Sequence, residues 1–69
     1  MEDHVYKKVE VVGTSSVSVE EAVRNAVRRA SESIRNLRWF EVSEIRGDIS
    51  GTEVAHFQVT VKLGFRVDD

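Results

Sequence analysis

Cysteine and proline are both missing from this 69-residue sequence, and histidine occurs only twice. Without cysteine there is no disulfide, and a structural zinc site of the usual Cys/His type is not indicated. Without proline, the small oligomeric tautomerases, which use an N-terminal proline, are excluded. A chain of this length buries only about 60% of its unfolded surface. Since disulfides and zinc are not available, we expect oligomerisation to supply the missing stability.

The net charge is also small: ten Lys and Arg residues and twelve Asp and Glu residues give a formal charge of −2. This balance gives no overall attraction to nucleic acid or to an anionic membrane. No apolar run approaches the roughly 20 residues that span a bilayer, and the N-terminal MEDHVYKKVEVV is too charged for a signal peptide. We therefore expect one soluble, cytoplasmic domain over residues 1–69.

One helix signal stands out in the first half of the chain. Ser18 followed by Glu21 forms a capping box, and apolar residues then recur every three or four positions as far as Leu37. The pattern predicts a helix that begins at Val19 and has about 18 residues. Three alanines in its apolar stripe predict a close approach to a sheet and a thin core.

Alternation of apolar and polar residues predicts three strands. They cover about residues 4–13, residues 39 to about 49, and residues 53–67. Gly13 ends the first strand ahead of turn residues, and the segment 50–53 turns the hairpin. Because the helix joins the first two strands, they can be parallel flanks with the third strand between them, antiparallel to both. The expected class is α+β, with β-α-β-β order and a three-stranded antiparallel sheet packed on one helix.

The third strand alternates along its whole length, so its two faces are well defined. One face, which must meet the helix, consists of Ala55, Phe57, Val59, Val61, Leu63, Phe65 and Val67. The other consists of Val54, His56, Gln58, Thr60, Lys62, Gly64 and Arg66. This second face is mostly polar but has few charges at its centre, which indicates contact with another subunit. A closed oligomer would also protect the long strand edges from uncontrolled pairing.

The only tryptophan, Trp39, stands at the start of the second strand. By period, Phe40 and Val42 face the helix and Trp39 points to the opposite side of the sheet. There it can be a subunit-interface residue or a platform on which a flat ring stacks. The amide of Gln58 can donate to and accept from the edge of a heterocycle, and Arg46 can bind a phosphate. Period and spacing leave both the role and the ligand open.

Catalytic chemistry has little support in the sequence. His4 and His56 are far apart, and no pattern of acidic ligands surrounds them. No glycine-rich phosphate loop is present. Cap and turn roles are sufficient for Ser15, Ser16 and Ser18. We therefore expect neither an enzyme nor a metal site.

Nucleic-acid binding is an alternative of a different class, because arginines concentrate on and after the predicted helix. They are Arg24, Arg28, Arg29, Arg35 and Arg38. The acidic residues between them and the negative net charge argue against this alternative.

Four short motifs occur together and in order: Trp-Phe-Glu-Val, Ile-Arg-Gly, Phe-Gln-Val and Gly-Phe-Arg. They belong to the segments WFEVSEIRG and HFQVTVKLGFRVDD, and VEVVGTS precedes them. In this combination the chain resembles the dodecins, small flavin-binding proteins of bacteria and archaea, from about Tyr6 to Asp69. The resemblance implies a three-stranded antiparallel sheet wrapped on one helix, and twelve copies assembled into a hollow shell.

The resemblance also implies a ligand and its contacts. Trp39 would stack a flavin, either FMN or riboflavin, between neighbouring subunits. Gln58 would hydrogen-bond the isoalloxazine edge, and Arg46 would bind the phosphate of FMN. Coenzyme A is a second implied ligand, near three-fold contacts, and the candidate residues for it are Arg66, Lys7 and Lys8. The implied function is flavin storage with suppressed photochemistry. The alternative is a shell-forming structural protein whose pocket is empty or holds another flat ligand.

Overall fold

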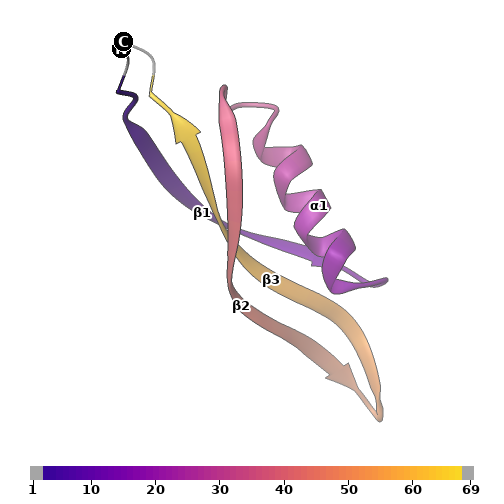
Figure 1. Ribbon diagram of the computed structural model, residues 1–69. Helices are drawn as coiled ribbons and strands as arrows, with labels where there is room; N and C mark the ends of the chain where they lie inside the picture. The colour runs from indigo at the N-terminus through magenta and orange to yellow at the C-terminus, as the bar shows by residue number, and fades with distance from the viewer. Residues whose placement is uncertain (1–2, 68–69) are drawn as a thin grey trace.

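Residues 3–67, the part of the chain that the computed structural model describes, form three strands and one helix (Figure 1). The elements are β1 (Tyr6–Ser15), α1 (Val19–Ala30), β2 (Leu37–Ser50) and β3 (Glu53–Arg66). The sheet has the order β1-β3-β2, and β3 is antiparallel to both neighbours. The predicted class and topology are therefore confirmed, with the last strand in the middle and the first two as parallel flanks.

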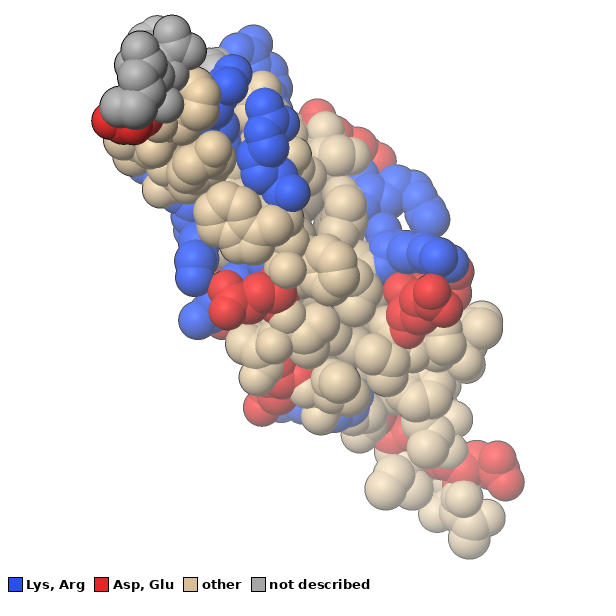
Figure 2. Space-filling model, viewed as in Figure 1, with Lys and Arg blue, Asp and Glu red and all other residues tan. Residues whose placement is uncertain are grey.

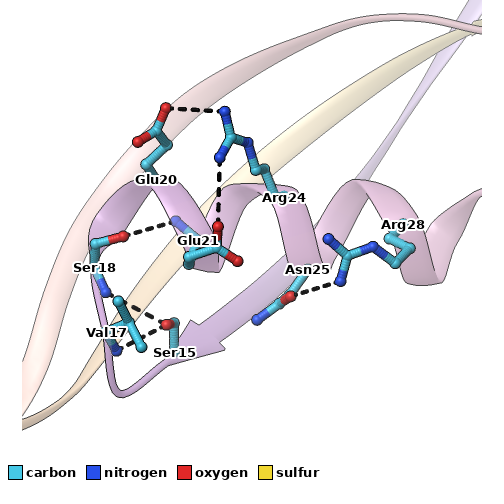
Figure 3. Close-up of polar contacts among 8 residues, drawn as sticks. All are labelled: Ser15, Val17, Ser18, Glu20, Glu21, Arg24, Asn25 and Arg28. Carbon is cyan, nitrogen blue, oxygen red and sulfur yellow. Dashed lines mark hydrogen bonds and ion pairs between the residues drawn. The ribbon is translucent and has the colours of Figure 1, made fainter.

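The start of α1 agrees with the sequence signal. Ser18 is the N-cap, and its hydroxyl accepts a hydrogen bond from the backbone N–H of Glu21 at 3.0 Å (Figure 3). Ahead of it, the buried Ser15 hydroxyl accepts from the N–H of Val17 at 2.9 Å, which closes the turn between β1 and α1. Within residues 3–67, no helix is both long and apolar enough to cross a membrane.

The end of α1 differs from the prediction. The helix stops at Ala30 after 12 residues, so the expected length of about 18 is wrong. A turn follows, in which the N–H of Ile34 donates to the carbonyl of Ala30 at 2.9 Å, and Asn36 has a left-handed φ of 67°. Ile34 and Leu37 still pack against the core from this turn and from β2. Their spacing extended the apolar stripe although they are not helical.

The core lies between α1 and the middle strand. It consists of Ala22, Ala26, Ala30, Val59, Val61 and Leu63. The helix packs against β1 and β3, whereas residues 38–50 of β2 are all exposed. The hairpin of β2 and β3 extends past the helix in Figure 1. An apolar face of β2 is thus left uncovered on the helix side of the sheet.

Gly13 does not end β1, as the sequence suggested, because the strand continues through it to Ser15. The glycine is required by the close approach of α1. A Cβ at this position would meet the carbonyl oxygen of Ala22 and would lie 2.9 Å from the methyl group of Ala26. The close helix–sheet approach that the alanines predicted is therefore real, and Gly13 is part of it.

Replacing Gly13 with alanine should destabilise the fold by about 1–3 kcal/mol, because the added methyl group must push α1 away from the sheet. Urea unfolding measures this as a lower midpoint. Val12→Thr is the matched control, since Val12 is the neighbouring strand residue and is exposed. A midpoint in Gly13→Ala equal to that of the control would contradict the tight contact.

Candidate functional site

Trp39 lies on the sheet face opposite the helix, as its period predicted. Leu63 faces α1 and is 1% exposed, so the next residue, Gly64, points to the outer face, where the indole covers it. The ring of Tyr6 meets the indole edge-on, with centroids 5.2 Å apart and planes at 61°. Trp39 nevertheless keeps 40% of its surface exposed. One side of the indole is therefore seated on the sheet, and the other is open to a ligand or a partner.

A β-bulge decides where the charged residues of β2 point. Strict alternation would put Arg46, seven positions after Trp39, on the helix side. The register shifts between Val42 and Glu44, so that Arg46 lies opposite Gln58 on the outer face. The hydroxyl of Ser43, the extra residue, donates to the carbonyl of Thr60 at 3.3 Å.

Sequence reasoning missed this bulge, although a signal for it exists. The apolar residues of β2 change from even to odd positions across Ser43: Phe40 and Val42 precede it, and Ile45 and Ile49 follow it. A change of phase inside one strand is what a bulge produces. Its effect is that Trp39, Arg46 and Gln58 share one face.

Gln58 belongs to a small hydrogen-bonded network on this outer face. The Nε of Arg46 donates to Oε1 of Gln58 at 2.9 Å, and Nε2 of Gln58 donates to Oδ2 of Asp48 at 3.5 Å. A primary amide can donate two and accept two hydrogen bonds, so these contacts use half of that capacity. They also fix which side of the amide carries the oxygen. Asp48 was not a candidate from the sequence.

The structure does not bring Trp39 and Gln58 together within one chain. Trp39 lies opposite Gly64, and Gln58 is six residues away from Gly64 along β3. At 3.3 Å per residue the separation is about 20 Å. A flat ligand stacked on Trp39 therefore cannot reach Gln58 of the same copy. The two groups can contact one ligand only if they come from different copies of the chain.

Lys8 lies opposite Gly64, the residue that the indole of Trp39 covers, and it forms an ion pair with a carboxylate. Its Nζ is 3.0 Å from Oε1 of Glu41, in a pair that is half exposed on both sides. The hydrogen bond and the charge of Lys8, with the charge of Lys62, lower the pKa of the Glu41 carboxyl. The pair bridges β1 and β2 across the middle strand. Because both side chains are half exposed, the pair contributes little to the stability of the fold.

Only two of the three candidates for coenzyme A line the same hollow. Lys7 and Arg66 line one hollow of about 410 Å³ beside the turn after α1, together with Arg35. Lys8 does not line this hollow and is paired with Glu41. On the face shown in Figure 2, basic side chains gather toward the end of the molecule where the chain termini lie. An anionic ligand would find its counter-charges at this end.

The two histidines lie at opposite ends of the sheet. His4 contacts the ring of Tyr6 edge-on, with centroids 6.4 Å apart, and His56 lies opposite Asp48 near the hairpin tip. Over residues 3–67, no group of three or more His, Cys, Asp or Glu side chains is arranged to hold a metal ion.

The family model described as Dodecin matches residues 5–68 of the chain. A dodecin from Thermus thermophilus is 49% identical over 65 residues, which are 94% of each chain. The solved dodecin of Streptomyces coelicolor is 55% identical, with a TM-score of 0.94 over 100% of this chain and 99% of that one. The chain therefore belongs to the dodecin family, which is known for dodecameric assembly and is a family of small binding proteins. The last residues of the resemblance, Asp68 and Asp69, lie outside the described residues.

A more distant relative is named for calcium. The calcium dodecin of Mycobacterium tuberculosis is 29% identical over 63 residues, 91% of this chain and 89% of that one. Its solved structure has a TM-score of 0.80, covers 93% of this chain and 91% of that one, and is described as calcium-chelating with a novel calcium-binding site. Membership of the family thus defines the fold and a binding role more firmly than it defines the ligand.

Proposed function

We propose that this protein binds and stores flavin, either FMN or riboflavin, between Trp39 residues of neighbouring subunits in a homododecamer. One observation carries the proposal. The face of the indole covers Gly64 on one side and is open on the other, at the outer surface of a sheet. An exposed aromatic face held in a fixed place is the surface on which a flat heterocycle stacks.

Edge recognition comes from the network around Gln58. A flavin presents neighbouring carbonyl and N–H groups at the pyrimidine edge of its ring system. The remaining donor and acceptor capacity of the Gln58 amide matches that edge. The guanidinium of Arg46 has further N–H groups beyond the Nε that binds Gln58, and these can bind the phosphate of FMN.

Assembly is part of the proposed function, since a single chain supplies only part of the site. Trp39 and Gln58 are about 20 Å apart along the sheet, at 3.3 Å per strand residue. The apolar side of β2 is exposed in the single chain and is available to a neighbouring subunit. A shell of twelve copies would cover this surface and place the indole of one copy near the amide of another.

Flavin held against an indole loses its fluorescence and its photochemistry. The excited flavin accepts one electron from the electron-rich indole of Trp39, and the electron then returns, so that no net reaction occurs. The bound flavin would therefore be protected, and the cell would be protected from it. This behaviour belongs to storage rather than to catalysis, and the proposed location is the cytoplasm, where flavin nucleotides are used.

Coenzyme A is proposed as a second ligand, in the hollow lined by Lys7, Arg35 and Arg66. The three cations suit its phosphate groups. Lys8 does not line this hollow and is paired with Glu41, so it is the weakest of the candidates.

The absorption spectrum and the mass of the purified particle test this function directly. A flavin-storing dodecamer should be yellow or should quench added riboflavin, and its mass should correspond to twelve chains of 7.8 kDa. A colourless particle of that size that leaves riboflavin emission unchanged would instead be a structural shell. A salt-sensitive shift with an oligonucleotide would identify a nucleic-acid-binding protein.

Replacing Gln58 with leucine should weaken flavin binding roughly 5- to 150-fold, because two hydrogen bonds of about 0.5–1.5 kcal/mol each are lost. Titration of FMN followed by flavin emission measures the change. Thr60→Val is the matched control, since Thr60 is the next residue on the same face of β3 and makes no proposed ligand contact. If both variants bound FMN as the unchanged protein does, Gln58 would have no part in recognition.

A further inference from the structure

The indole of Trp39 rests on Gly64, and we call the surface that supports this ring, formed by Gly64 and Tyr6, its seat. Gly64 lies in β3 between Trp39 of β2 and Lys8 of β1 in the sheet register. It is buried although it faces the outer side, because the indole covers it. A Cβ on Gly64 would overlap the indole carbons Cε2, Cζ2 and Cδ2, because it would lie much closer to them than van der Waals contact allows. Three ring atoms at similar distances from one point show that the ring presents its face to the glycine.

Tyr6 of β1 supports the indole of Trp39 at one edge. The indole extends from β2 across β3 and meets the tyrosine ring edge-on at a centroid distance of 5.2 Å. Edge-to-face contact is a favoured geometry for aromatic pairs. Tyr6 is itself 42% exposed, so it acts as a side wall rather than as a cover. The indole is thus supported below by a backbone and at one edge by a ring.

We propose that Gly64 and Tyr6 are positioning residues that set the height and tilt of the Trp39 indole, and thereby the width of the flavin slot. This inference rests on the proposed function. With no side chain beneath it, the ring lies as low on the sheet as the backbone permits. Any side chain at position 64 would lift or swing the ring outward. Since the slot is formed by the indoles of two subunits, each displacement would narrow it from both sides.

A fixed indole also determines which class of ligand can bind. A stack of flat rings needs a gap with parallel walls, each in contact at about 3.5–4.0 Å. A low, fixed indole keeps that gap open before the ligand arrives, so that little ordering is needed on binding. The seat therefore selects planar, fused heterocycles, and it disfavours non-planar ligands.

Gly64→Ala tests the seat, because the added methyl group faces the indole and not the core. Flavin affinity should fall at least tenfold, measured by titration of riboflavin. In the flavin-free protein, the emission anisotropy of Trp39 should fall and its emission should shift, because a displaced indole is more mobile and more solvated. The chain has one tryptophan, so this emission reports on Trp39 alone. Tyr6→Leu should produce the same two changes to a smaller degree.

A double-variant cycle separates the seat from general damage to the strand. In a Trp39→Ala background, Gly64→Ala should leave the thermal midpoint unchanged, since no ring remains to be displaced. If Gly64→Ala alone fails to fold, the double variant should fold again. Equal anisotropy and equal flavin affinity in Gly64→Ala and in the unchanged protein would overturn the proposal. If the unchanged protein bound no flavin, the proposed function would fail, and the seat would be judged by the Trp39 emission alone.

Discussion

Replacing Trp39 with alanine should weaken flavin binding roughly 5- to 150-fold for each stacked face that is lost, while the twelve-chain particle remains. The range follows from about 1–3 kcal/mol for stacking of a flat ring on an aromatic side chain. Trp39 is 40% exposed and is not part of the buried core of alanine, valine and leucine, so the fold does not depend on it. Flavin that still binds to the variant should fluoresce, because its electron donor is gone.

Titration of riboflavin with emission as the readout measures both effects, and sedimentation of the same samples measures the assembly. Trp39→Phe is the matched control. It keeps an aromatic face but has a smaller and less readily oxidised ring, so it should bind with intermediate affinity and quench less. If Trp39→Ala instead dissociated into monomers, the indole would be mainly an interface residue. Flavin emission that stayed strong on binding to the unchanged protein would contradict the quenching role.

The order and type of the elements could be predicted from the sequence because each has a local cause. The capping box of Ser18 and Glu21 marks the start of α1, and alternation marks the strands. The ends were harder to predict. Apolar spacing shows which residues face the core, and Ile34 and Leu37 do so from outside the helix. Gly13 resembled a strand end, whereas its lack of a side chain serves the contact with Ala22.

For the site, the sequence predicted the candidate residues and the side of the sheet on which Trp39 lies, but not how the residues are arranged. The side of Trp39 followed from simple alternation with Phe40 and Val42. The side of Arg46 depends on the bulge at Ser43, which the alternation rule does not include. The contact of Trp39 with Gly64 and Tyr6 depends on the register of all three strands, and no local pattern gives that register.

The uncovered face of β2 leads to the second large expected effect. Ile45 lies opposite Val59, which is fully buried beneath the helix, so Ile45 points to the same side of the sheet. It is nevertheless 60% exposed, because α1 packs against β1 and β3. With Phe57 and Val19 it lines a hollow of about 290 Å³ near the hairpin. In the proposed dodecamer, a neighbouring subunit would cover this surface.

Ile45→Asp should therefore disrupt the particle, since an unpaired buried carboxylate costs several kcal/mol, and the cost recurs in every subunit. Sedimentation should show small species in place of the twelve-chain mass. Ile45→Val, which removes one methylene from the same surface, should remain assembled. The disrupted variant retains Trp39, Gln58 and Arg46, yet it should lose flavin binding, because the indole and the amide of one chain are about 20 Å apart at 3.3 Å per residue. Bound flavin should then follow the fraction of assembled particle across a dilution series. An intact Ile45→Asp dodecamer, or a monomer that binds flavin with full affinity, would contradict a site shared between subunits.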